Sequence, residues 1–87
     1  MKVVNLLDGT EVEMESILAM YTGSLQGLNN DAALEPEVFE KSVHGRIMTR
    51  DLVLHELNLL QSGFIFWIKI DPVPGDGVVW VPAKMIP

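Results

Sequence analysis

The clearest hydrophobic pattern in the chain is a pair of apolar runs near its C-terminal end. Residues 64–70 (Phe-Ile-Phe-Trp-Ile-Lys-Ile) and residues 78–81 (Val-Val-Trp-Val) are rich in β-branched and aromatic side chains, the types that are enriched in strands. The segment 71–77 between them contains two Pro, two Gly and two Asp residues, a composition typical of a connecting loop. The pattern therefore predicts a C-terminal β-hairpin.

The first of these runs is apolar on both of its faces. Alternate side chains of a strand point to opposite faces. One face would carry Phe64, Phe66, Ile68 and Ile70. The other would carry Ile65 and Trp67 before it turns polar at Lys69. The run is therefore predicted to be a central strand, or a strand whose second face is covered. The long loop does not fix the register of the hairpin, so whether Trp67 meets Trp80 stays open.

The N-terminal part begins with a predicted short strand over residues 2–7, which ends at an Asp-Gly pair. Two continuations are open. Asp-Gly between apolar runs favours a hairpin, with residues 10–15 as the return strand. Thr10 followed by Glu13 is instead a capping-box pattern, and a helical stripe comes after it, made up of Met14, Ile17, Leu18, Tyr21 and Leu25. Because this stripe is longer than the strand alternation, a helix over residues 11–22 is the favoured prediction.

Capping signals predict two further helices. The first, over residues 36–44, begins at Pro36, which suits the first helical position, and stops before Gly45. The second, over residues 49–62, has Thr49 as its N-cap and a glycine as its stop. Both helices precede the predicted hairpin.

The last predicted helix carries more apolar surface than one sheet would cover. One stripe of ordinary width consists of Val53, Leu54, Leu57 and Leu60. Leu52 and Leu59 form a second stripe. Either the helix predicted over residues 11–22 or another subunit would cover it, so Leu52 and Leu59 are candidate partner-binding residues. Trp67 and Trp80 join them, because Trp is the residue type most enriched at interface hot spots.

Together these elements predict a single α+β domain spanning residues 1–87. It has an N-terminal strand, two or three helices and a C-terminal β-hairpin, in the order β-α-α-α-β-β. The arrangement ββ-α-α-ββ follows if the Asp-Gly pair makes a hairpin, and a winged-helix-like arrangement is the other alternative. The 87 residues suffice for one hydrophobic core.

Charge and composition narrow the function classes. The net charge is −6, and residues 1–40 hold eight acidic residues against one basic residue. This half of the chain would repel phosphate backbones and anionic membranes, so nucleic-acid binding is disfavoured. The absence of cysteine excludes disulfides and thiolate chemistry and fits a reducing compartment. With apolar runs too short to span a membrane and no signal-peptide pattern, a cytoplasmic protein is expected.

Catalytic and metal-binding patterns are weak. Asp51 and His55 share one helix face at a spacing of four, but no nucleophile is near them in sequence. His44 suits the end of its predicted helix. The residues after His55 lack the second histidine of a zinc-protease motif, and the Gly-Asp-Gly of the hairpin loop lacks the lysine of a phosphate-binding loop. We expect no catalytic residue, metal or cofactor.

Two stretches are similar to known folds. Residues 36–81 resemble a winged-helix arrangement, in which residues 49–62 would be the recognition helix and the hairpin the wing. That helix would offer few groove-reading side chains, since only Arg46 and Arg50 lie near its start. The stretch 77–86, Gly-Val-Val-Trp-Val-Pro-Ala-Lys-Met-Ile, is similar to the closing strand of SH3-like barrels, although the predicted helices contradict that fold.

The expected function is that of a small acidic interaction module without enzymatic activity. It would self-associate, giving a homo-oligomer, or bind a partner protein through Leu52, Leu59, Trp67 and Trp80. Small phage-encoded accessory proteins and other inhibitors or regulators are of this kind. The alternatives are a winged-helix-type transcriptional regulator and a small-molecule sponge with a site between subunits.

Overall fold

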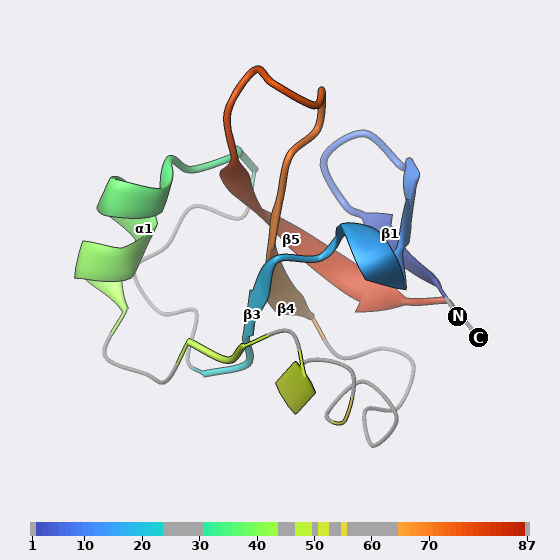
Figure 1. The fold of residues 1–87 in the computed structure, drawn as a ribbon, viewed down its shortest axis with the longest axis horizontal. Coiled ribbons are helices and arrows are strands. Elements are labelled where there is room, and N and C mark those ends of the chain that lie inside the picture. Colours follow the sequence, from blue (N-terminus) through green and yellow to red (C-terminus); the bar gives the residue numbers. More distant parts are fainter. Residues whose placement is uncertain are drawn as a thin grey trace.

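The computed structural model describes residues 2–23, 31–43, 47–49, 51–52, 55 and 65–86. Five strands form one antiparallel sheet in the order β2-β1-β5-β4-β3. The strands are β1 (Lys2–Asn5), β2 (Glu11–Glu13), β3 (Ala19–Tyr21), β4 (Phe66–Ile70) and β5 (Val79–Met85). A short 3-10 helix, η1 (Met14–Ser16), and one α-helix, α1 (Pro36–Ser42), complete the described elements. In Figure 1, α1 lies at the left of the sheet and β1 lies at its right.

The predicted α+β domain with three helices is wrong. The favoured helix over residues 11–22 is absent, and β2, η1 and β3 occupy that stretch. The order of the described elements is therefore β-β-η-β-α-β-β, which also contradicts the winged-helix-like and ββ-α-α-ββ alternatives. Most of the helix predicted over residues 49–62 lies outside the described residues. Within this stretch, the described residues Asp51, Leu52 and His55 are helical.

A tight hairpin replaces the predicted first helix. Asp8 accepts hydrogen bonds from the Thr10 N–H (2.9 Å) and the Thr10 hydroxyl (2.7 Å), and Gly9 takes a positive φ of 77°, which glycine adopts without strain. The side chain of Glu13 forms an ion pair with Lys2 instead of capping a helix. Of the apolar positions that suggested a helix, Met14, Ile17 and Tyr21 are buried, whereas Leu18 is exposed. Long-range strand pairing therefore overrides local helical spacing in this stretch.

The C-terminal hairpin is present, with Trp67 opposite Pro82 and Lys69 opposite Trp80. The prediction that residues 64–70 contain a central strand is confirmed, since β4 lies between β5 and β3. The predicted helix at Pro36 is also present, but it ends at Ser42. Val43 is extended, with φ −98° and ψ 141°, and β-branched residues fit that conformation well.

Each face of the sheet carries its own hydrophobic cluster. On one face, which α1 covers, the aromatic cluster consists of Tyr21, Phe39, Trp67 and Trp80. The aliphatic cluster consists of Val3, Val12, Met14, Ile17, Met20, Met48, Phe66, Ile68, Ile70, Val81 and Ala83. In β4, Phe66, Ile68 and Ile70 belong to the aliphatic cluster and Trp67 belongs to the aromatic cluster, which explains why this strand is apolar on both faces.

Candidate functional site: a cleft along the β2 edge

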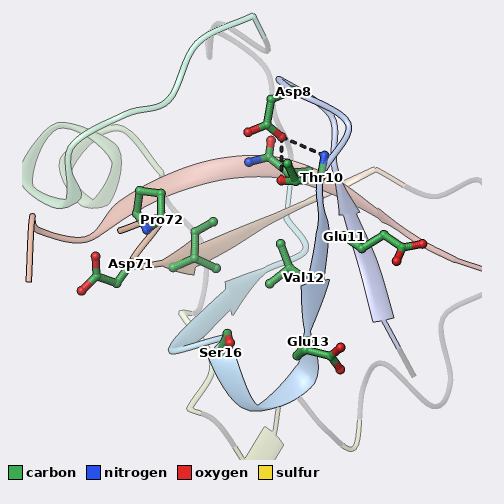
Figure 2. Close-up of a pocket in the computed structure, with 10 residues that line it drawn as sticks. Asp8, Thr10, Glu11, Val12, Glu13, Ser16, Asp71 and Pro72 are labelled. Carbon is green, nitrogen blue, oxygen red and sulfur yellow. Dashed lines mark hydrogen bonds between the residues drawn. The ribbon is translucent and has the colours of Figure 1, made fainter. Parts of the chain in front are cut away.

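A cleft of about 340 Å³ lies between β2 and the end of β4. All three residues of β2 line it, together with Ser16 of η1 and the segment Ile70, Asp71 and Pro72. Asn5, Asp8 and Thr10 of the β1–β2 hairpin close one end. Figure 2 shows these residues arranged around the space between the two strands. The site therefore brings together segments that are about sixty residues apart in the chain.

The cleft exists because the sheet does not continue from β2 to another strand. After β2 the chain enters η1, whose turn is closed by a hydrogen bond from the Ile17 N–H to the Met14 carbonyl (3.1 Å). It then joins the far edge of the sheet as β3. On the facing side, Pro72 follows the end of β4, and proline has no N–H to donate to a strand pair. The gap between β2 and this segment stays unpaired among the described strands.

The floor of the cleft is apolar and its rim is polar. Val12 and Ile70 are buried members of the aliphatic cluster, and they line the cleft from its two sides. Figure 2 shows the Val12 side chain pointing toward the Asp71 side, whereas the side chains of Glu11 and Glu13 point away from it. Because of this alternation, β2 contributes its main chain and Val12 to the cleft and its carboxylates to the outer face.

Glu11 and Glu13 also direct their main-chain N–H and C=O groups away from β1. In an antiparallel pair, hydrogen-bonded and non-hydrogen-bonded positions alternate. The Asn5 N–H donates to the Thr10 carbonyl at 2.8 Å, and the register of β1 with β2 makes Val12 the next hydrogen-bonded position. Glu11 and Glu13 are therefore the non-hydrogen-bonded positions, and their main-chain polar groups face the open edge of the sheet.

The outer face of β2 is negatively charged. Lys2 Nζ lies 3.3 Å from a Glu13 carboxylate oxygen and 3.5 Å from a Glu11 carboxylate oxygen. The hydrogen bond and charge of Glu13, and then the charge of Glu11, raise the pKa of Lys2. One ammonium faces two carboxylates, so negative charge is left over. Because all three side chains are well exposed, these pairs contribute little to stability.

Two aspartates hold the ends of the cleft in place. Both hydrogen bonds from Thr10 lower the pKa of Asp8, the main-chain bond first, and keep the hairpin tight. Asp71 accepts a hydrogen bond from the Gly75 N–H through Oδ2 (3.1 Å), which stabilises the loop between β4 and β5. Its Oδ1 atom is buried without a hydrogen-bond partner among the described residues.

Of the candidate partner-binding residues predicted from the sequence, the structure brings Trp67 and Trp80 together, and neither lines the cleft. Trp67 and Trp80 are 0% exposed and belong to the aromatic cluster. Leu52 is half-buried and packs against the aliphatic cluster on the other face, and Leu59 lies outside the described residues. A contact between these four side chains and a partner stays a prediction, and the structure gives the two Trp residues a role in the core.

Sequence reasoning missed the cleft. The one local signal is the Asp-Gly pair, which indicates the β1–β2 hairpin, but the longer helical stripe that follows it favours a helix. No sequence signal indicates that Ile70 and Asp71 lie across from Val12, because that proximity depends on the curvature of the whole sheet.

The titratable side chains outside the cleft form no second cluster in the part of the chain that the structure describes. Among the described residues, no group of three or more His, Cys, Asp or Glu side chains is placed to hold a metal ion. Asp51 and His55 are both exposed, and His44 lies outside the described part. Within that part, no helix has the length and apolar character needed to cross a membrane. No protein-family model, no curated protein and no solved structure matches this chain.

Proposed function

We propose that this protein is a non-enzymatic interaction module that binds a segment of a partner protein in the cleft along β2. The observation that carries this proposal is that β2, an edge strand, lines the cleft with all of its residues. Edge strands with free N–H and C=O groups are templates for pairing with another chain. Proteins that recognise extended peptides commonly use such an edge, which supplies main-chain hydrogen bonds.

The cleft also offers a source of affinity besides hydrogen bonds. Val12 and Ile70 form an apolar floor next to the open edge, so a side chain of a bound segment would lose contact with water there. Burial of apolar surface contributes about 25 cal/mol per Å². Side-chain packing in the cleft would therefore add specificity to main-chain pairing at the edge.

A Glu13→Pro variant tests the proposal. Glu13 has φ −71° and ψ 146°, which suits proline, and its N–H faces away from β1. The substitution therefore removes one outward donor with little effect on the fold. In affinity capture from a lysate of cells that naturally make the protein, we expect the wild type to retain a protein that Glu13→Pro does not retain, whereas Glu13→Gln, which keeps the N–H, should still retain it. Identical capture by the wild type and Glu13→Pro would contradict the proposal.

A small-molecule ligand is the second candidate function, because the cleft volume of about 340 Å³ falls at the lower end of the range for ligand sites. Binding of such a ligand would raise the melting temperature with ligand concentration. Since a ligand held by Val12 and Ile70 would not need the outward N–H, its effect should be the same in the wild type and in Glu13→Pro.

A further inference from the structure

Of the two sheet edges, β2 is the open one in the described part of the chain. The outer edge of β3 is partly covered, because the Met48 N–H donates to the Met20 carbonyl at 3.0 Å and the two residues form an antiparallel bridge. No such bridge involves β2 among the described residues. An added strand would therefore pair at β2.

The side chains of β2 define what the added strand should carry. Glu11 and Glu13 share one face of the strand, and Val12 is on the other. A strand that pairs with β2 alternates in the same way, so its residues beside the two glutamates would lie on the charged outer face. Opposite charges in neighbouring strands attract, and Lys2 already occupies the corresponding place on the β1 side. Basic residues at these positions of the added strand would place each glutamate between Lys2 and a second cation.

The same charges disfavour a second copy of this chain at the edge. Antiparallel pairing of β2 with β2 of another molecule, centred on Val12, would set Glu11 of one copy opposite Glu13 of the other on one face. Like charges at directly opposite positions are destabilising. Charged residues on a short edge strand are also a known protection against self-pairing. The edge therefore rejects a second copy while it attracts a strand of opposite charge.

We infer that the cleft binds an extended basic segment of a partner protein, which adds to β2 as a sixth strand. This inference rests on the proposed function and specifies its partner. Two Lys or Arg residues, spaced two apart, lie on the Glu11 and Glu13 face, and the residue between them is apolar and points toward Val12 and Ile70. The outward N–H and C=O groups of the two glutamates form the main-chain hydrogen bonds.

Synthetic peptides and amide hydrogen exchange test this inference. The probe is a blocked hexapeptide with the central sequence Lys-Val-Lys, and the matched control replaces both lysines by glutamate. We expect the basic peptide to bind and to slow exchange of the Glu11 and Glu13 amides, because these N–H groups gain partners on strand addition. The acidic peptide should bind at least about tenfold more weakly, and added salt should weaken binding of the basic one.

Two variants separate failure of the charge argument from failure of the edge site. The double variant Glu11→Gln with Glu13→Gln should bind the basic peptide about fivefold more weakly. At saturating peptide, amide hydrogen exchange at positions 11 and 13 should still be slowed. If both peptides bind equally and Glu13→Pro abolishes binding of both, the edge site stands and the basic preference is overturned.

If the basic peptide binds without slowing exchange at Glu11 and Glu13, strand addition at β2 is overturned, and the proposed function with it. The same holds if neither peptide binds and Glu13→Pro captures the same proteins from the cell lysate as the wild type. Methylation of the peptide's backbone nitrogens provides a second measurement that does not depend on how the variants fold. It should abolish binding, and unchanged affinity would also overturn strand addition.

Discussion

The ring of Phe39 stacks on the indole of Trp80, with ring centroids 4.3 Å apart and an interplanar angle of 18°. The same ring lies 5.1 Å from the indole of Trp67 and meets Tyr21 edge-on at 5.7 Å. Phe39 is the buried residue of α1, so the helix packs its apolar side on the sheet through this side chain. Offset and edge-on aromatic contacts add stability beyond the area that they bury.

Replacement of Phe39 by alanine should therefore destabilise the fold strongly. We expect a loss of about 3–5 kcal/mol in the free energy of unfolding, because removal of a fully buried phenylalanine ring leaves a cavity. Urea unfolding followed by Trp fluorescence measures this loss and reports on both indoles. Val38→Ala on the same helix is the matched control, because Val38 is 53% exposed and its loss should change stability by no more than about 0.5 kcal/mol. Equal effects of the two changes would contradict the role of Phe39.

The Asp8 hairpin turn should be sensitive to a side chain at Gly9. Its φ of 77° lies in the left-handed region, and nothing lies within 4 Å of an added Cβ, so the cost of Gly9→Ala is conformational. We expect about 1 kcal/mol of destabilisation in urea unfolding. Gly9→Asn should cost less than Gly9→Ala, because asparagine tolerates this region better. A reversed order would show that the turn changes conformation in the variants.

Asp8 should make stability depend on pH in acid. Hydrogen bonds from Thr10 lower its pKa below the ordinary value of 3.8, so the ionised form stabilises the folded state. That contribution is complete above the ordinary pKa and is lost as the pH falls through the lowered pKa of the folded state. The wild type should therefore be more stable than Asp8→Asn near pH 7, and the difference should shrink below about pH 4.

Unfolding free energies of both proteins between about pH 7 and pH 2 test this prediction. Thr10→Val removes the hydroxyl donor and keeps the main-chain one, so its pH dependence should fall between those of the wild type and Asp8→Asn. A difference between wild type and Asp8→Asn that stays constant with pH would contradict the assigned role of Asp8.

Two neighbouring proline substitutions should differ sharply in their effect on stability. Glu13→Pro removes an N–H that faces away from β1, at a residue with φ −71°, so we expect a change of no more than about 1 kcal/mol. Val12→Pro removes an N–H that pairs with β1 and disturbs a buried side chain. It should cost about 2 kcal/mol or more. Urea unfolding measures both, and equal losses would contradict the assignment of Val12 as a hydrogen-bonded position and Glu13 as a non-hydrogen-bonded position of β2.

Several elements follow from local sequence. The C-terminal hairpin of β4 with β5, the strand that begins at Lys2 and the helix that begins at Pro36 were predicted, although the strand and the helix each end two residues earlier than expected. In each case, composition and neighbouring turn or cap residues point to the same answer. The apolar character of both faces of β4 predicted a central strand or a strand whose second face is covered, and β4 lies between β5 and β3 with a hydrophobic cluster on each face.

The sequence by itself determined the N-terminal strand, the C-terminal hairpin, where the acidic charge lies and that β4 is apolar on both faces. Only the tertiary structure decided the secondary structure of residues 11–22, whose apolar spacing fits one helix as well as two short strands joined by a turn. There, pairing of Val12 with Val3 and of Met20 with Ile68 outweighs local preference, since burial against distant strands contributes more than helix propensity. The cleft also arises only at this level, because it is the gap that remains where a curved sheet leaves β2 without a neighbour.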